Sequence, residues 1–410
     1  MSEEHTHYHG VDKAEQHLSV AEARRILLES IHTVRQEVVN VSQSDGRVLS
    51  NEVISPRDLP SRARSTRDGY AVSMGSLSSF KIVGEVRIGV VPKLALKPGE
   101  AARVATGSYL PGDTDAVLMI EYAKVDGKTL VTDREIKVGE NIIAKGEDFA
   151  RGQLLLGKGT RIHPQQVALL SMLGVSKISV YKKPRIAFFS TGDELVDPAK
   201  NAKGIFDANR PFIAAMVSRL GGVPVDLGIA RDNYGEIKKK IVKGLKFDAL
   251  FISAGSSVGE RDYVAKAVES IGGVKILVHG VAMRPSSPTG IATYKGKPFI
   301  LLPGFPTSTI VSFLVFGIPA ILSTGGSTIV EPPMIRAKLS EDYPGKPGIT
   351  HFVRVRIKRD KEEYAASVVR PTEAQYSSWL KQANGIVVIG ELGSAKQGEM
   401  VDAFLIGELS

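Results

Sequence analysis

Residues 185–195 read RIAFFSTGDEL, an apolar run followed by a turn of small residues and two carboxylates. It is the first of several apolar runs with the length and composition of buried strands, at 185–190, 223–229, 249–253, 275–279 and 299–302. Helix starts are predicted between these runs, near 209–211, 232–233 and 262–263. Strands that alternate with helices indicate an α/β domain at 179–326, with a doubly wound, mostly parallel sheet and right-handed crossovers.

The chain on either side of this domain has a different texture. A polar, histidine-bearing segment at 1–17 is expected to be a flexible tail. Residues 51–140 contain short β-rich runs broken by turns, which predict a small β-rich domain. Residues 327–410 alternate like strands without any further βα pattern, so they predict a C-terminal β domain.

Two helical segments flank the small β-rich domain. Ser19 and Glu22 form a capping box that begins an amphipathic helix of about 20 residues. A second helix is predicted to begin at Pro164. We expect the two helices to pack together, so that residues 18–50 and 141–178 form one discontinuous domain.

Composition excludes several classes of chemistry. The 410-residue chain has no cysteine, so it has no disulfide, thiolate metal site or cysteine nucleophile. The net charge of +9 suits anionic ligands, but the basic residues are scattered and no nucleic-acid motif accompanies them. We therefore expect no nucleic-acid partner, and a basic, soluble surface also explains the charge.

Nothing in the sequence indicates membrane association. The N-terminal segment lacks an apolar signal core, and the longest apolar run, at 311–322, contains Gly317 and Pro319 and is too short to span a bilayer. We therefore predict a soluble, cytoplasmic protein. Histidines near the N-terminus could bind a metal ion, although a solvated chain end explains them without one. These histidines are His5, His7, His9 and His17.

Ligands of an open parallel sheet bind beyond the carboxyl ends of the strands, so the residues after each strand carry the functional information. After the first strand come Asp193 and Glu194, whose oxygens suit a Mg²⁺ ion on a diphosphate. After the third strand, the small residues at 253–259 resemble a phosphate cradle. A helix-start turn and a simple connection are the plainer interpretations, and Asp232 and Asp262 would then only cap helices.

Two further loops complete this edge. Arg284 follows the fourth strand in a proline-stiffened loop, and its planar guanidinium suits phosphate or another oxyanion; a surface arginine is the plainer interpretation. Pro303 and Pro306 frame a turn after the fifth strand, which shapes a pocket floor or only ends the strand. No histidine or cysteine nucleophile accompanies the four loops, so together they predict binding and Mg²⁺-assisted phosphoryl or phosphoanhydride chemistry.

Motifs along nearly the whole chain resemble those of one family, the molybdopterin molybdenumtransferases, which include bacterial MoeA and the E domain of gephyrin. The matching segments occur in the family's order, at 65–71, 105–121, 139–142, 146–148, 190–195, 207–210, 253–263 and 302–306. Their number, order and spacing make the resemblance specific, whereas each fragment alone would not.

The resemblance implies an elongated homodimer of four-domain subunits, with a MogA-like doubly wound domain and with the discontinuous domain at 18–50 and 141–178 used for dimerisation. The active site would lie between the doubly wound domain of one subunit and the small β domain of its partner. The resemblance also implies that adenylylated molybdopterin is cleaved with molybdate or tungstate, that Mg²⁺ assists, and that AMP is released. A molybdopterin adenylyltransferase and enzymes that accept the cofactor are the partner proteins it suggests.

Carried over by motif, Asp193, Glu194 and Asp262 would lie near the metal and the phosphates, with Asp232 beside them. A larger set at the same edge would contact the pterin phosphate, the nucleotide and the anion. This set consists of Thr191, Gly192, Ser253, Gly255, Ser256, Ser257, Gly259, Arg284, Ser287, Pro303 and Pro306. The groups that would approach from the partner subunit or the neighbouring domain are Asp68, Thr106 and Asp148.

Departures from the family's motifs fall where the anion should bind. The usual Lys-Pro-Gly-Lys-Pro is Arg-Pro-Ser-Ser-Pro here, at 284–288, so Ser287 stands where a second lysine is usual. Ala254 and Ser256 occupy the second and fourth places of a cradle that is usually Ser-Gly-Gly-Val-Ser, and Phe305 replaces an asparagine. Because a hydrogen bond to a charged group contributes about 1.5 to 3 kcal/mol, loss of the lysine should weaken anion binding roughly ten- to a hundred-fold.

Three functions stay open from the sequence. The first is the transferase, with altered activity. The second is a catalytically impaired paralogue that keeps the pterin pocket and acts as a binding or scaffold protein, which the changed anion loop favours. The third is the preceding step, adenylylation of molybdopterin, whose enzymes usually carry Gly-Gly-Thr-Gly where this chain has Ala-Gly-Ser-Ser at 254–257. Fold alone does not decide among them, and we rank them in this order.

Overall fold

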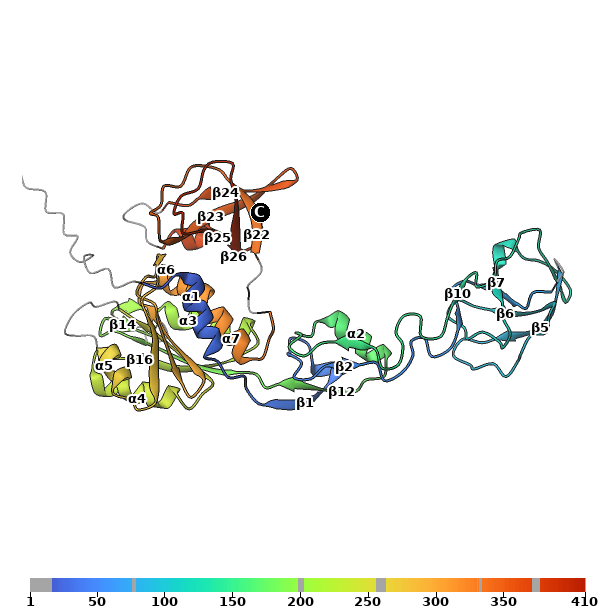
Figure 1. Ribbon diagram of the computed structural model, residues 1–410, viewed down its shortest axis with the longest axis horizontal. Coiled ribbons are helices and arrows are strands. Elements are labelled where there is room, and N and C mark those ends of the chain that lie inside the picture. Colours follow the sequence, from blue (N-terminus) through green and yellow to red (C-terminus); the bar gives the residue numbers. More distant parts are fainter. Residues whose placement is uncertain are drawn as a thin grey trace, which may run out of the picture.

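The computed structural model describes residues 17–75, 79–197, 203–255, 263–329, 331, 334–370 and 377–409. The chain is elongated (Figure 1). An α/β domain lies at one end with a C-terminal β domain beside it, a small middle domain follows, and a β-rich distal domain lies at the other end. The multi-domain α/β fold predicted from the sequence is confirmed.

The α/β domain is built on a six-stranded sheet that contains all five predicted strands. The strands are β13 (Arg185–Thr191), β16 (Val223–Ala230), β17 (Ala249–Ala254), β18 (Val274–His279), β20 (Gly290–Tyr294) and β21 (Lys297–Pro303), in the order β16-β13-β17-β21-β20-β18. The first four strands in this order are parallel neighbours. β20 was not predicted, and it is antiparallel to both β21 and β18, so the sheet is mixed at this side.

The missed strand has a local explanation. β20 is short and is joined to β21 by a tight turn at Lys295 and Gly296, both of which have positive φ. The apolar run of β20 is therefore too short to stand out from the sequence around it. The helices between the strands, in contrast, begin close to the predicted positions. They are α3 (Asn209–Arg219), α4 (Tyr234–Gly244) and α5 (Tyr263–Glu269).

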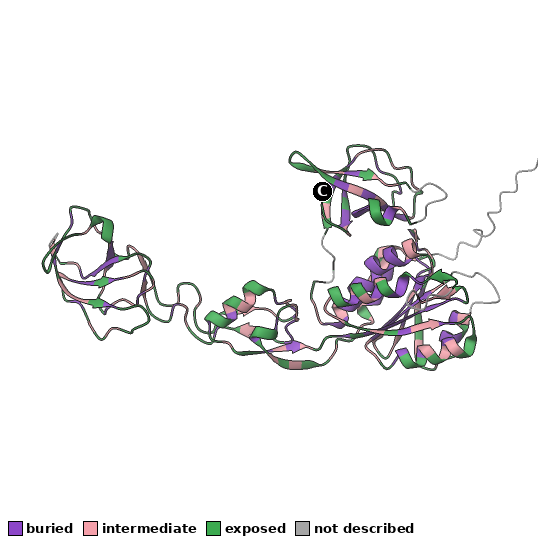
Figure 2. Cartoon of the chain, turned by 180° about the vertical axis from the view of Figure 1, so that it is seen from behind, coloured by how far each residue is buried: buried purple, intermediate pink, exposed green. Residues whose placement is uncertain are grey.

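Both faces of the sheet are covered, as the continuous apolar strands require. Phe188 of β13 faces a core formed with α3 and the helices that follow β21, whereas its neighbour Phe189 faces a second core formed with α4 and α5. Figure 2 shows the purple, buried strands between helices whose outer faces are green and exposed. The alternation of side chains along a strand thus divides the domain into two apolar layers.

One long apolar helix follows β21. It is formed by α6 (Pro306–Ser312), a π-helical segment (Phe313–Gly317) and α7 (Ile318–Thr324), and Gly317 and Pro319 do not end it. Its 19 residues have a mean hydropathy of 1.7 and are long and apolar enough to cross a membrane, so the expectation from the run at 311–322 was wrong on length. The helix is 72% buried inside the protein, where Phe313 packs edge-on against Phe251. Burial in the α/β core therefore accounts for its composition.

The first helix departs from expectation in two ways. α1 spans only Val20–Glu29, because the chain then becomes extended as β1 (Gln36–Asn40). Ala23 and Leu27 of α1 are buried in the core that contains Phe188, so the helix belongs to the α/β domain and does not pack with the helix after Pro164. The predicted pairing of these two helices was wrong, because the chain between them leads away from the sheet.

Extended segments, and not helix packing, join the two halves of the middle domain. β1 pairs with β12 (Lys177–Tyr181), and β2 (Val53–Ile54) pairs with β11 (Leu154–Leu156), both antiparallel. α2 (Pro164–Met172) covers them together with a 3-10 helix at Val41–Gln43. The boundary between the middle and distal domains therefore falls a few residues beyond the predicted limits at 50 and 141.

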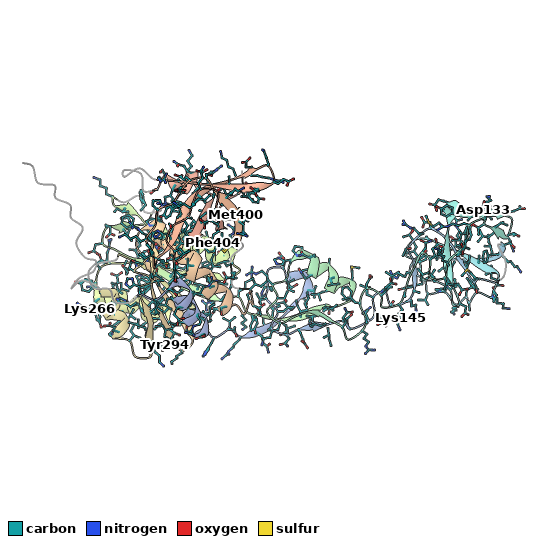
Figure 3. All side chains as sticks on the ribbon, turned by 45° about the horizontal axis from the view of Figure 1, so that its top comes forward. Asp133, Lys145, Lys266, Tyr294, Met400 and Phe404 are labelled. Carbon is teal, nitrogen blue, oxygen red and sulfur yellow. The ribbon has the colours of Figure 1, made fainter. Side chains whose placement is uncertain are left out.

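The distal domain is a β-rich unit whose sheet has the order β7-β4-β6-β5-β9-β8. Apolar clusters lie on both faces of this sheet. Its strands are β3 (Arg64–Ser65), β4 (Gly69–Val72), β5 (Ser79–Val86), β6 (Glu100–Val104), β7 (Ala116–Met119), β8 (Lys124–Asp126), β9 (Thr129–Val131) and β10 (Ile142–Ile143), with a 3-10 helix at Ile120–Tyr122. β3 pairs with β10 where the domain meets its two connecting segments, near Lys145 (Figure 3).

The C-terminal domain is docked on the α/β domain through a shared sheet and a shared core. It contains β22 (Met334–Leu339), β23 (Thr350–Asp360), β24 (Glu363–Val368), α8 (Trp379–Gln382), β25 (Gly385–Ile389) and β26 (Met400–Leu405). β19 (Met283–Arg284), which belongs to the α/β domain, pairs in parallel with β23. Trp379 and Phe404 lie in the same core as Phe313, and Phe404 points toward the α/β domain while Met400 lies farther from it (Figure 3).

Trp379 should therefore stabilise the contact between these two domains. The residue is fully buried, and its indole N–H donates to Thr307 Oγ1 at 2.9 Å. Trp379→Ala should lower the free energy of unfolding by about 3–5 kcal/mol, whereas Trp379→Phe should lose mainly the hydrogen bond, about 1 kcal/mol. The exposed neighbour Leu380 is the control, and Leu380→Ala should change stability by less than about 0.5 kcal/mol. Calorimetric unfolding that showed equal effects for Trp379→Ala and Leu380→Ala would contradict this docking role.

Candidate active site

The carboxyl ends of the parallel strands meet at one edge of the α/β sheet. β16, β13, β17 and β21 run in the same direction, and β18 shares that direction because β20 is antiparallel to both of its neighbours. The loops that carry Asp193, Asp232, Gly255, Pro303 and Arg284 therefore all leave the sheet on one side. The structure confirms the predicted common edge for these loops.

Three carboxylates gather after β13 and β16. The Asp232 N–H donates to Asp193 Oδ1 at 3.2 Å, and the Asp193 N–H donates to Asp232 Oδ2 at 3.4 Å. Glu194 folds back over Gly192, where an added Cβ would lie 2.7 Å from Glu194 Oε1. Burial raises the pKa of Asp232, and the negative charges of Asp193 and Glu194 raise it further. A cation held here would relieve this repulsion.

The predicted metal ligands are not all among the described residues. Asp193 and Glu194 lie at the sheet edge, but Asp262 falls outside the described part of the chain, as do Ser256, Ser257 and Gly259 of the cradle. Within the residues described, no three His, Asp or Glu side chains are arranged to hold one metal ion. The three-carboxylate metal site therefore stays a prediction. Of the N-terminal histidines, only His17 is described, and its ring lies beside Gly280.

The floor of the edge is tied together by Asn209, which the sequence marked only as part of a helix start and of a family motif. Its Nδ2 donates to Ser253 Oγ and to the Gly304 carbonyl, both at 2.7 Å. Gly304 lies so close to β17 that an added Cβ would approach the Ala254 carbonyl and the Gly255 N–H to 3.0 Å. A side chain at Gly304 would crowd the end of β17, so the close approach of the two strand ends favours glycine there.

Two buried oxygens at this floor are left without partners. Asn209 Oδ1 and Ser190 Oγ are enclosed, and neither has a hydrogen-bond partner within the described residues. Buried polar atoms are nearly always satisfied, so an orphaned pair at a strand edge indicates that a ligand or a bound water completes the site. The group that binds here must be able to donate hydrogen bonds to Asn209 Oδ1, which only accepts them.

A buried arginine holds the start of α3, which positions Asn209. Arg210 Nε donates to Asp207 Oδ2 at 2.7 Å, and Nη1 donates to Asp226 Oδ2 at 2.6 Å. Nη2 reaches Asp197 Oδ2 at 3.2 Å. Asp207 Oδ1 also accepts the Asn209 N–H at 3.0 Å, so the same carboxylate caps the helix. The acid three residues before an arginine at a helix start is the sequence signal for this network, and it appeared above only within a family motif.

The Arg284 loop adapts to its departures from the usual motif. Ser286 stands at the usual glycine position and has φ of 88°, a conformation that costs an ordinary residue about 1–2 kcal/mol. Its buried hydroxyl donates to the Ser308 carbonyl at 2.7 Å, which offsets part of that cost. Ala254 lies at the end of β17 without positive φ, so the alanine at this place of the cradle causes no backbone strain. Ser287 supplies no positive charge, and Phe305 is 66% exposed.

The C-terminal domain positions Arg284 through β19. In the pairing of β19 with β23, Arg284 lies opposite His351, which is buried. His351 Nε2 accepts the Lys346 N–H at 3.1 Å, so Nδ1 carries the proton toward the Tyr343 hydroxyl at 3.2 Å. Burial lowers the pKa of His351, and the Arg284 charge lowers it further, which keeps the imidazole neutral. The guanidinium of Arg284 stays exposed at the sheet edge.

The remaining predicted residues divide into two groups. Pro303 and Pro306 frame the turn into α6, and the Thr309 hydroxyl donates to the Pro303 carbonyl, so this part of the floor is rigid. Asp68 Oδ1 accepts the Thr106 N–H at 2.7 Å and its hydroxyl at 3.1 Å, and both bonds lower the pKa of Asp68. Asp68, Thr106 and Asp148 lie on or beside the distal domain, at the opposite end of the chain from the sheet edge (Figure 1). One chain alone does not bring the two groups together.

Asp232 offers a test of the carboxylate cluster. Its folded-state pKa is raised, so its charge opposes folding at neutral pH, and protonation removes this penalty as the pH falls through the raised pKa. Asp232→Asn should raise Tm at pH 7, and the gain should vanish at low pH, where the natural side chain is also neutral. Glu22→Gln in the same domain is the control. It should lower Tm at pH 7, because the hydrogen bond with Arg25 lowers the pKa of Glu22 and the substitution removes its charge. A Tm at pH 7 that Asp232→Asn leaves unchanged or lowers would refute the crowding of charge.

Comparison with known proteins follows the same domain order. Family models match the MoeA N-terminal region (domain I and II) at residues 18–174, a probable molybdopterin binding domain at 187–323, and the MoeA C-terminal region (domain IV) at 336–406. A molybdopterin molybdenumtransferase from Nostoc sp. is 34% identical over 304 residues, which cover 71% of this chain and 70% of that protein. One from Bacillus subtilis is 29% identical over 389 residues, which cover 91% of this chain and 90% of that protein.

Solved structures agree with these matches. The molybdopterin biosynthesis MoeA protein from Pyrococcus horikosii has a TM-score of 0.80 and 31% identity, over 96% of this chain and 100% of that chain. A second MoeA structure, from Pyrococcus horikoshii OT3, has a TM-score of 0.81 and 27% identity, over 95% of this chain and 100% of that chain. Since three family models span the chain in order and the full-length fold is shared, this protein belongs to the MoeA family of molybdenum cofactor biosynthesis.

Proposed function

We propose that the protein is a molybdopterin molybdenumtransferase, which inserts molybdate or tungstate into molybdopterin with cleavage of adenylylated molybdopterin and release of AMP. The observation that carries this proposal is the sheet edge itself. It combines a crowded carboxylate group, an arginine, and the unsatisfied oxygens of Asn209 and Ser190 within one rim. Family membership supports the choice of substrate, because relatives at about 30% identity bear the name of this activity.

The residues at the rim have distinct proposed roles. Mg²⁺ would be held by Asp193 and Glu194 with Asp262, and it would neutralise the charge that develops on the phosphates. The raised pKa of Asp232 fits such a group, because the crowded carboxylates favour a cation. Ser253 and the small residues after it would bind phosphate through main-chain N–H groups. Arg284 would hold the anion with its planar fork.

The distal residues would act in a homodimer. Asp68 and Thr106 form a hydrogen-bonded pair on the domain farthest from the sheet edge, so they can complete the site only from a second subunit. This arrangement fits an elongated chain in which each end carries a part of the predicted active site. The substrate is supplied by a molybdopterin adenylyltransferase, and the product passes to enzymes that accept the cofactor. A soluble pterin substrate fits the cytoplasmic location that we predict.

The alternative is a paralogue that binds pterin or partner proteins without turnover. Ser287 favours it, because the anion loop has one cation where the family usually has two. The backbone of the loop does not favour it, because Ser286 and Ala254 are both accommodated. The loss is therefore one of charge and not of shape, and weaker anion binding follows more directly from it than complete inactivity.

The transferase is tested by AMP release from adenylylated molybdopterin with Mg²⁺ and either molybdate or tungstate. We expect AMP release with one of the two oxyanions. Arg284→Gln should lower kcat/KM about tenfold or more, and Ser287→Lys should lower the KM for the oxyanion about tenfold, since each changes one charged hydrogen bond. Lys358→Gln, on the exposed part of β23, is the control for loss of a positive charge and should change neither value.

The same assay separates the two functions. If the natural protein released no AMP with either oxyanion, while the triple variant Ala254→Gly, Ser287→Lys, Phe305→Asn did, the scaffold function would replace the transferase. Consumption of ATP in the presence of free molybdopterin would instead favour the adenylyltransferase.

A further inference from the structure

Two neighbouring segments of the distal domain gather positive charge beside Asp68. Arg64 and Tyr109 form an antiparallel bridge, and the Ser65 N–H donates to the Ser108 carbonyl at 3.0 Å, so residues 61–68 run beside 105–110. The first segment carries Arg62, Arg64 and Arg67, and Arg103 lies close enough to Asp68 to lower the pKa of that carboxyl. Within the described residues, these four arginines make no ion pair with a carboxylate.

Arg64 is held in place but not satisfied. Its guanidinium lies over the Tyr109 ring at 4.7 Å from the ring centre, and Nη2 donates to the Tyr109 hydroxyl at 3.1 Å. Its Nε is buried and has no acceptor within the described residues. A guanidinium that is fixed by stacking loses little further freedom when an oxyanion binds its outer N–H groups.

Tyr109 reports the local potential. Hydrogen bonds with Ser61 and Arg64 lower the pKa of its phenol, and the charges of Arg64 and Arg62 lower it further. The charges of Arg64 and Arg62 beside the phenol would also attract a phosphate. Hydroxyl and guanidinium donors therefore converge on one small patch, which consists of Ser61, Arg62, Arg64 and Tyr109 and which we name the arginine patch.

We propose that the arginine patch is a phosphate-binding site of the distal domain. Its donors match a phosphate group: two guanidinium groups and two hydroxyls. Neither the carboxylates nor the loops of the sheet edge belong to it. In the proposed dimer, the patch lies beside the Asp68 and Thr106 that would face the partner's sheet edge, and it supplies positive charge that Ser287 does not. This last role rests on the proposed function, whereas the binding of phosphate does not.

Calorimetric titration of the full chain with inorganic pyrophosphate, without divalent metal, tests the site directly. The double variant Arg62→Gln, Arg64→Gln should weaken binding about tenfold or more, since charged hydrogen bonds are lost. Lys128→Gln is the control for loss of an exposed positive charge, because it removes one from the β8–β9 turn of the same domain, in a different sheet from β3. The exposed Arg62→Gln alone should show a smaller loss without disturbing the fold.

A second readout uses the phenol. Bound pyrophosphate places negative charge beside Tyr109, so it should raise the pKa of that phenol, measured as the difference in ultraviolet titration between the natural chain and Tyr109→Phe. An effect of pyrophosphate on this difference supports the site, and its absence at saturation overturns it. Pyrophosphate binding that is lost in Arg284→Gln but kept in the double variant would assign the anion to the sheet edge and overturn the proposal, as would no binding by the natural chain.

The two proposals fail in different ways. Pyrophosphate binding at the arginine patch without AMP release would remove the transferase and leave the phosphate site. AMP release that is unchanged in the double variant, together with unchanged pyrophosphate affinity, would remove the phosphate site and leave the transferase.

Discussion

The side-chain amide of Asn209 joins α3 to the ends of β17 and β21, and the geometry of the sheet edge depends on this contact. Its two hydrogen bonds, to Ser253 and to the Gly304 carbonyl, form where Gly304 lets the strand ends approach closely. Arg210 lies next to Asn209 at the start of α3 and binds three carboxylates, so it keeps the amide in position. A buried arginine with three partners is costly to desolvate, so it acts here as a positioning device more than as a source of stability.

The shape of the chain places its polar groups at two distant ends. The chain leaves the α/β domain through β1, passes through the middle domain to the distal domain, and returns through β12. Paired extended segments span more length per residue than a helix does, and pairing makes them stiffer than single strands. The acidic rim of the α/β domain and the basic patch of the distal domain are therefore complementary surfaces that one chain keeps apart.

The departures from the family's anion motif have unequal consequences. Ser286 takes a positive φ but gains a hydrogen bond, and Ala254 continues a strand, so neither reshapes the loop. Ser287 removes a charge that no described neighbour in the loop replaces, because the only cation of residues 284–288 is Arg284. The C-terminal domain does not replace this charge, but it positions the one that remains. β23, which carries the neutral His351, pairs with the backbone at Arg284.

The sequence by itself determined five of the six strands of the α/β sheet, the helix starts and the common edge, because apolar runs and capping residues act locally and parallel strands must end together. It could not determine that α1 packs on the α/β sheet, since the apolar face of a helix does not indicate which surface will cover it. Nor could it identify Asn209 or the arginine patch, because their partners lie 44 to 95 residues away in the one case and 45 in the other. Contacts between such distant residues exist only after the chain has folded, and they decided which polar groups meet.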